Sequence, residues 1–140
     1  MSFAKRVVID TSTLIGALLK PQSIPRQAFL RAMASSTVCV SPATLDELEV
    51  VLMRDKFDRY LDRESRQIFL HHYRVATFLF PITVNEENAL IPSCRNPRDN
   101  KFLALALHCS AQCLISSDAD LLELNPWQNI PILTPGQFLQ

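Results

Sequence analysis

The chain has 140 residues, a length that predicts a single domain over residues 1–140. Its 14 basic and 14 acidic side chains leave no net charge, so no overall field attracts nucleic acid, and its 48% hydrophobic content predicts a globular fold. Its apolar stretches are shorter than the roughly 20 residues of a membrane span, and its first residues lack a signal-peptide pattern. We therefore expect a cytoplasmic protein that is not attached to a membrane.

Short apolar runs alternate with longer helical patterns along the chain. Strands are predicted at residues 7–9, 37–40, 79–83, 113–116 and 130–133. Helices are predicted at residues 12–19, 25–34, 42–54, 62–78, 97–109 and 118–124, and residues 85–96 are expected to form a loop that can include a helical turn. Strands separated by helices imply right-handed crossovers, so the pattern predicts an α/β fold with a central, mainly parallel sheet.

Acidic side chains follow two of the predicted strands. Asp10 comes directly after the strand at 7–9, and Asp118 lies two residues beyond the strand at 113–116. In an open parallel sheet, ligands bind at the carboxyl ends of the strands, where the strand order reverses. Both acids therefore lie where a site is expected. Each could instead cap the helix that follows it, with Ser12 and Asp120 as the competing caps.

Two further acids lie on predicted helices. Asp99 has apolar residues at spacings i+3, i+4 and i+7, which places its carboxylate on the apolar face of the helix. A first-turn acid can also complement the helix dipole, but that role does not require an inward orientation. Glu47 lies at the edge of an apolar stripe, whereas Asp46 and Glu49 are expected to face solvent. Glu47 could accordingly be a functional acid or a half-buried boundary residue.

Several carboxylates in one place repel one another unless a cation lies between them. Two like charges 4 Å apart cost about 4 kcal/mol at an effective dielectric constant near 20. Carboxylate oxygens without cysteine or histidine partners suit Mg²⁺ or Mn²⁺, the ions that assist phosphate chemistry. The four cysteines have no Cys-x-x-Cys spacing and are expected to be buried, reduced thiols, and the chain has no glycine-rich phosphate loop.

Four segments in order carry the motifs of a known family: VVIDTSTLIGALL at 7–19, ELEVVLMRDKF at 47–57, NPRDNKFLALAL at 96–107 and LISSDADLL at 114–122. In these motifs and their spacing the chain resembles PIN-domain proteins over nearly its whole length. The subgroup that it resembles contains the VapC-like toxins of toxin–antitoxin pairs. The resemblance implies a three-layer, Rossmann-like α/β/α sandwich and a ribonuclease that depends on Mg²⁺ or Mn²⁺.

The resemblance also implies a role for single acids. The four acidic residues of the family map onto Asp10, Glu47, Asp99 and Asp118. A further acid often seen in the subgroup maps onto Asp120. These side chains are expected to hold one or two metal ions for the hydrolysis of a phosphodiester bond.

Three other positions are informative in the same comparison. Ser116 matches a small hydroxyl-bearing position of the family, where it would orient a carboxylate or a water. Ser12 stands where many members have Asn, and Asn96 stands where the subgroup often has Asp. Neither departure falls on one of the four acids.

Single-stranded RNA is the expected substrate, held by basic side chains near the acids. The predicted phosphate contacts are Arg54, Lys56, Arg95 and Lys101. Arg54 and Lys56 belong to a set of six basic residues between positions 54 and 74. That set could equally form a solvated helical face, because acidic residues interleave with it.

Other functions are compatible with the same acids. A structure-specific DNA nuclease would use the same cluster, because the acids position metal and do not read the sugar. A non-catalytic binding module could retain the cluster without using it. From the resemblance alone we also expect a homodimer and an antitoxin protein as partner.

Overall fold

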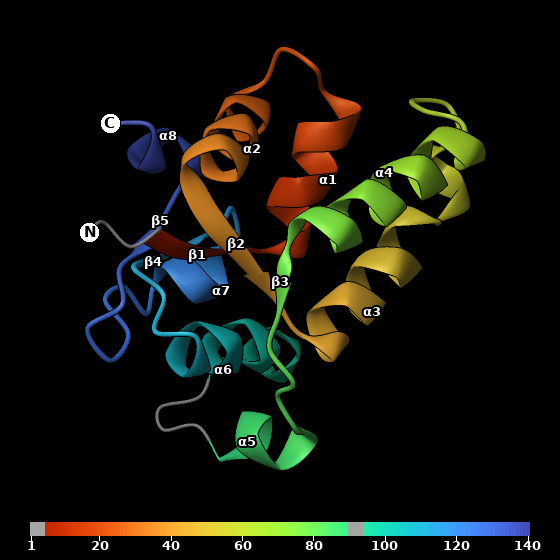
Figure 1. The fold of residues 1–140 in the computed structure, drawn as a ribbon. Helices are drawn as coiled ribbons and strands as arrows, with labels where there is room; N and C mark the ends of the chain where they lie inside the picture. Colours follow the sequence, from red (N-terminus) through yellow and green to blue (C-terminus); the bar gives the residue numbers. More distant parts are fainter. Residues whose placement is uncertain (1–4, 90–93) are drawn as a thin grey trace.

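The fold is built on five short strands. The computed structural model describes residues 5–89 and 94–140 (Figure 1). The strands are β1 (Lys5–Ile9), β2 (Ser36–Val40), β3 (Phe78–Leu79), β4 (Cys113–Ile115) and β5 (Ile132–Leu133). They form one sheet in the order β3-β2-β1-β4-β5, and every pairing is parallel, as predicted. Because β1 pairs with β2 on one side and β4 on the other, the strand order reverses beside β1.

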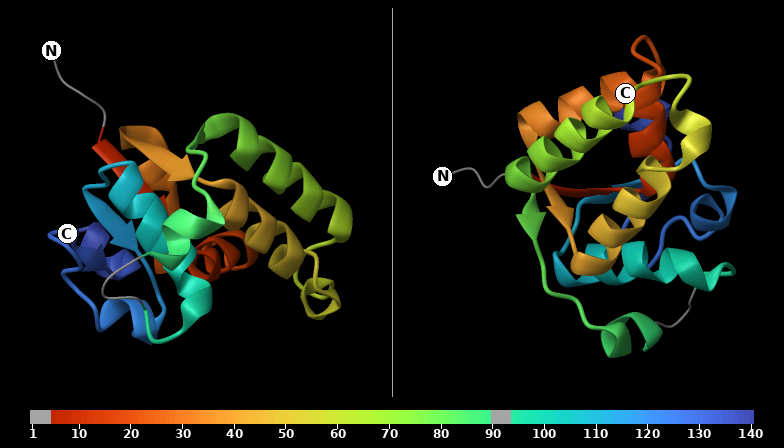
Figure 2. Two further views of the ribbon diagram at one scale, coloured as in Figure 1. Left: turned by 90° about the horizontal axis from the view of Figure 1, so that it is seen from below. Right: turned by 90° about the vertical axis from the view of Figure 1, so that its right-hand side faces the viewer.

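Helices cover both faces of the sheet, which gives three layers (Figures 1 and 2). One layer contains α1 (Thr11–Leu19), α2 (Ile24–Ser35) and α8 (Pro135–Phe138). The other contains α6 (Asn100–His108) and α7 (Ala119–Leu122), and α5 (Val84–Asn88) packs against α6 on the side away from the sheet (Figure 1). The helix α3 (Pro42–Leu52) contacts both α1 and α6, and α4 (Arg63–Ala76) packs against α3. In the described ranges, no helix has the length and apolarity needed to cross a membrane.

Alternate residues of each strand face opposite layers. Val7 and Ile9 of β1 pack with Leu48 of α3 in one core cluster, whereas Val8 packs with Leu103 of α6 in the other. Burial of both faces explains why the strands read as continuous apolar runs. The four cysteines are buried and none forms a disulfide in the described structure, as expected from their spacing.

Two strands are shorter than their apolar runs suggest. The strand predicted at 79–83 pairs only at Phe78–Leu79, because it lies at the sheet edge and its one partner, β2, ends at Val40. The strand predicted at 130–133 pairs only at Ile132–Leu133. Ile130 instead forms an isolated antiparallel bridge with Trp127 and does not pair with β4.

Three other segments can be compared with the prediction. The predicted loop at 85–96 begins as the helix α5, and its residues 90–93 lie outside the described residues. The helix α8 was not predicted, although its signal is local: Thr134 and Gln137 form a capping box around Pro135 at the first helical position. The helix predicted at 97–109 begins as a 3₁₀ turn, η2 (Pro97–Asp99), and continues as α6.

One residue of the predicted basic face is buried. Arg66 of α4 is fully buried and donates hydrogen bonds to the carbonyl oxygens of Leu52 (2.8 Å) and Arg54 (3.1 Å). It also pairs with Asp58, which follows the 3₁₀ turn η1 (Asp55–Phe57). Arg66 therefore joins the C-terminal end of α3 to α4, and it belongs neither to a solvated face nor to a phosphate-binding surface.

Candidate active site

The candidate site begins where β1 and β4 end side by side. Asp10 directly follows β1, is buried, and caps α1 by accepting a 3.0 Å hydrogen bond from the backbone N–H of Thr13. Of the two caps considered for this helix, Asp10 is the one used. Ser116 directly follows β4, and its hydroxyl donates a 2.5 Å hydrogen bond to Oδ2 of Asp10. The same hydroxyl accepts the backbone N–H of Asp118 at 2.9 Å, so Ser116 connects two of the acids.

Glu47 reaches this place from α3. It is half-buried, and its carboxylate accepts hydrogen bonds from Thr11 Oγ1 (2.5 Å) and from Lys101 Nζ (2.9 Å). Asp46 and Glu49 are exposed, as predicted from the helical spacing. The contacts to Thr11 and Lys101 come from α1 and α6, so Glu47 is held between two other helices.

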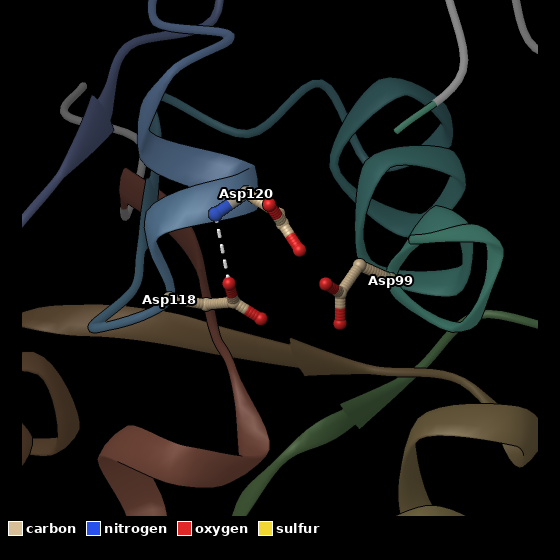
Figure 3. Close-up of side chains that lie close together, drawn as sticks. All are labelled: Asp99, Asp118 and Asp120. Atoms are coloured by element: carbon tan, nitrogen blue, oxygen red, sulfur yellow. Dashed lines mark hydrogen bonds between the residues drawn. The ribbon is translucent and has the colours of Figure 1, made fainter. Parts of the chain in front are cut away.

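Asp99, Asp118 and Asp120 form a cluster of three carboxylates (Figure 3). One carboxylate oxygen of each lies within 4.8 Å of the others. Asp99 is 8% exposed and, although it precedes α6, its side chain makes no capping hydrogen bond. Asp118 caps α7 by accepting the N–H of Asp120 at 2.8 Å. Asp99 therefore faces the other two acids and does not serve as a helix cap.

Burial raises the pKa of both Asp99 and Asp10, and neighbouring acids add to the shift of Asp99. Burial has the largest effect on Asp99, followed by the hydrogen bond and charge of Asp118 and then the charges of Glu47 and Asp10; together they raise its pKa to about 7. Burial also raises the pKa of Asp10, against the opposing hydrogen bonds from Ser116 and Thr13. Near pH 7 Asp99 is thus partly protonated, and a bound cation would displace this proton.

A cavity of about 190 Å³ opens between the acids. Its lining consists of Asp10, Thr11, Ser12, Glu47, Val51, Asp99, Phe102 and Asp118. All four acids predicted from the sequence thus border one space. Asp120 lies beside it in the three-carboxylate cluster. The charged groups that line the cavity are all carboxylates. Such oxygen ligands fit Mg²⁺ or Mn²⁺ and do not fit zinc.

The structure adds residues that the sequence interpretation did not single out. Thr11 is the first residue of α1, lines the cavity and holds Glu47. Its only sequence signal is its position directly after a strand-ending acid. The Cys94 thiol lies 4.0 Å from Oδ2 of Asp99 and 3.6 Å from the carbonyl oxygen of Asp120. Ser12, which the sequence interpretation did single out in the place of the usual Asn, has its hydroxyl 3.4 Å from both carboxylate oxygens of Asp10.

The predicted phosphate contacts fall in different surroundings. Lys101 belongs to the site, because its Nζ contacts the carboxylate of Glu47. Arg95 is exposed and pairs with Glu123 at 2.8 Å. Arg54 and Lys56 are exposed near the C-terminal end of α3, where the Lys56 ammonium lies 5.1 Å from the centre of the Phe57 ring.

Comparison with known proteins agrees with this architecture. The profile of the PIN domain matches residues 6–120. The chain belongs to the PIN domain family. A related sequence is the uncharacterized protein MJ1680 of Methanocaldococcus jannaschii, which is 27% identical over 144 residues, covering 96% of this chain and 90% of the relative.

Several solved structures superpose on nearly the whole chain. VapBC2 from Rickettsia felis, bound to a DNA fragment from its promoter, gives a TM-score of 0.64 at 14% identity, covering 92% of this chain and 98% of that one. VapC20 of Mycobacterium tuberculosis, a toxin that cleaves the sarcin–ricin loop, gives 0.60 at 15% identity, with 89% and 98% covered. FitAcB from Neisseria gonorrhoeae gives 0.60 at 17% identity, with 93% and 98% covered. These similarities confirm the predicted fold.

Proposed function

We propose that residues 1–140 act as one nuclease domain, a metal-dependent ribonuclease that hydrolyses phosphodiester bonds of single-stranded RNA. The observation that carries this proposal is the convergence of Asp10, Glu47, Asp99 and Asp118 on one cavity. An acidic cavity with a carboxyl pKa near 7 is suited to a divalent cation and unsuited to an anionic ligand by itself. Membership of the PIN domain family supports the same chemistry.

All five carboxylates would take part in holding metal, and two of them are also fixed by neighbouring hydroxyl groups. Asp99, Asp118 and Asp120 would hold a cation through the oxygens that lie within 4.8 Å of one another, with Asp10 and Glu47 completing the site. When bound, Mg²⁺ or Mn²⁺ would supply the positive charge that activates water and neutralises the phosphate. Ser116 holds Asp10, and Thr11 holds Glu47, so neither carboxylate has to be ordered when substrate arrives.

Lys101 is suited to bind the phosphate of the substrate. It is half-buried at the edge of the cavity, and its ammonium is the positive group in contact with Glu47. An RNA phosphate that approaches four carboxylates is repelled, and a nearby ammonium reduces that repulsion. We place Arg54, Lys56 and Arg95 farther along the RNA path, because all three are exposed.

We further propose that the protein is the toxin of a toxin–antitoxin pair and works as a homodimer in the cytoplasm. Support comes from the fold it shares with VapBC2, VapC20 and the FitAB proteins. An antitoxin gene beside the gene of this protein would be an inexpensive supporting observation. Size determination in solution, with and without a co-expressed antitoxin, tests both the partner and the dimer.

The deciding experiment compares nucleic acids of matched sequence. Purified protein with Mn²⁺ is expected to cut labelled single-stranded RNA, and EDTA is expected to stop it. Matched single-stranded and flapped DNA serve as controls. Cleavage of flapped DNA without cleavage of RNA would identify a DNA nuclease instead, and binding of RNA without any cleavage would identify a non-catalytic module.

A further inference from the structure

A second cavity lies at the opposite edge of the sheet from the acids. Its volume is about 430 Å³, within the range of roughly 300–1,000 Å³ typical of small-molecule sites. Lys5 and Arg6 begin β1, Thr37 lies near the start of β2 and Gln112 precedes β4, so the cavity lies at the amino ends of the central strands. The acids, in contrast, follow the carboxyl ends of β1 and β4.

The lining of this cavity combines cations with aromatic rings. Lys5 and Arg6 are exposed, neither forms an ion pair within the described residues, and no acidic side chain lines the space. Phe78 and Phe80 also line the cavity, with ring centres 5.0 Å apart. Phe78 is 57% exposed, so its ring is open to contact with a ligand in the cavity.

Two of these groups are held in place before any ligand binds. The Arg6 guanidinium donates a 3.1 Å hydrogen bond to the carbonyl oxygen of Cys109 and lies 5.6 Å from the centre of the Phe80 ring. That bond uses one nitrogen, and a guanidinium carries donors on two more. Phe80 is partly buried against the core beside α6. Arg6 and Phe80 therefore form a fixed wall, and Lys5 and Phe78 are exposed beside it.

We propose that this cavity binds a nucleotide, with the base stacked on Phe78 and the phosphate held by Lys5 and Arg6. Aromatic rings stack on bases of any sequence, and adjacent cations hold the backbone, which is the usual composition of single-strand binding sites. Thr37 and Gln112 offer hydrogen-bonding groups in the same lining. The nucleotide is either a free mononucleotide or one unit of a single-stranded RNA. The site does not depend on the proposed nuclease activity, because it shares no residue with the acidic cavity.

Binding can be located by NMR on ¹⁵N-labelled protein titrated with AMP in the presence of EDTA. Amide shifts are expected at Arg6, Phe78 and Gln112, and absent at Asp10 and Asp118. Ribose 5-phosphate, which lacks the base, should bind more weakly. Shifts confined to the carboxyl edge of the sheet, or none at all with either AMP or RNA, would overturn the proposal.

Matched variants then test the two parts of the site. Phe78→Ala should raise the Kd for AMP or for a labelled RNA of about six nucleotides roughly tenfold. Leu79→Ala, a neighbour in β3 that is 52% exposed and does not line the cavity, should leave both values unchanged. Lys5→Gln should reduce the salt dependence of binding, whereas Lys20→Gln should not. Tight binding of AMP assigns the site to a free nucleotide, and binding of RNA alone assigns it to a strand.

Two outcomes would contradict the nucleotide site directly. The first is an equal effect of Phe78→Ala and Leu79→Ala on nucleotide affinity. The second is unchanged nucleotide affinity together with altered self-association in Phe78→Ala, measured by sedimentation at several protein concentrations. That second result would mean that the exposed ring serves contact with another copy of the chain. A failure of RNA cleavage, by comparison, would bear only on the acidic cavity.

Discussion

The Ser116 hydroxyl donates a hydrogen bond of 2.5 Å to the carboxylate of Asp10 and thereby joins the ends of β4 and β1. The two residues are 106 positions apart in the sequence and both are buried. Because this hydroxyl also accepts the N–H of Asp118, it holds two acids of the cavity at once. Ser116 is thus a positioning residue for the acids.

Ser116→Ala should therefore weaken metal binding without removing any carboxylate. Loss of an orienting partner typically costs roughly 10–100-fold in metal affinity or activity, and we expect the lower end because Thr13 still holds Asp10. Isothermal titration with Mn²⁺ measures the effect. Ser117→Ala is the matched control, because that exposed hydroxyl lies 3.1 Å from Thr13 and contacts no carboxylate. Equal Mn²⁺ affinities in the two variants would refute the positioning role.

Asp99→Asn should stabilise the metal-free protein and abolish activity. The substitution removes one charge from a crowded cluster at nearly constant shape, and one pKa unit corresponds to about 1.4 kcal/mol. We expect the free energy of unfolding in EDTA to rise by about 1–3 kcal/mol. Urea unfolding of the variant, with exposed Asp46→Asn as control, measures this. A less stable Asp99→Asn protein would mean that Asp99 has a structural role.

The stability of the metal-free protein should fall as the pH rises toward neutrality. The pKa of Asp99 is raised from 3.8 to about 7 on folding, so the folded state binds the extra proton between these values. The stabilisation that comes from binding this proton at Asp99 is fully present below about pH 4 and is lost as the pH rises through about 7. Melting temperatures in EDTA from about pH 5 to pH 8 measure the trend. In Asp99→Asn the melting temperature should change less with pH, because this group no longer titrates. An identical pH dependence in both proteins would mean that other groups cause the trend.

The acids could be predicted because each has a local signal. Asp10 and Asp118 follow apolar runs, and the inward orientation of Asp99 follows from its spacing to apolar residues on one helix. The contacts of Glu47 could not be predicted, because Thr11 and Lys101 are 36 and 54 positions away and meet it only through the packing of α1, α3 and α6. The extent of β3, predicted as 79–83, was wrong for a similar reason, since the end of an edge strand depends on its partner.

Binding of Mn²⁺ should raise the melting temperature of the folded protein. A ligand at one hundred times its Kd stabilises the folded state by about 2.7 kcal/mol, which for a domain of this size is on the order of 10 °C. The rise should be absent in Asp118→Asn, which retains the cap but loses a charge, and present in Asp46→Asn. A melting temperature that is the same in EDTA and in saturating Mn²⁺ would contradict a cation site at these carboxylates.

Lys101→Gln should weaken RNA binding while leaving the metal site competent. The Lys101 ammonium lies 2.9 Å from the Glu47 carboxylate. Its removal takes away a positive charge that would attract the substrate phosphate. It also frees Glu47 from a cation that competes with the metal ion for this carboxylate. We expect a higher Kd for single-stranded RNA, a salt slope smaller by about 1, and Mn²⁺ affinity that is unchanged or higher. RNA binding is measured by fluorescence anisotropy in Ca²⁺ at two salt concentrations. Lys20→Gln serves as the control for loss of an exposed lysine. Arg54→Gln tests whether Arg54 also contacts the RNA. If Lys101 served only to hold Glu47, the affinities for RNA and for Mn²⁺ would fall together, and the salt slope would stay the same.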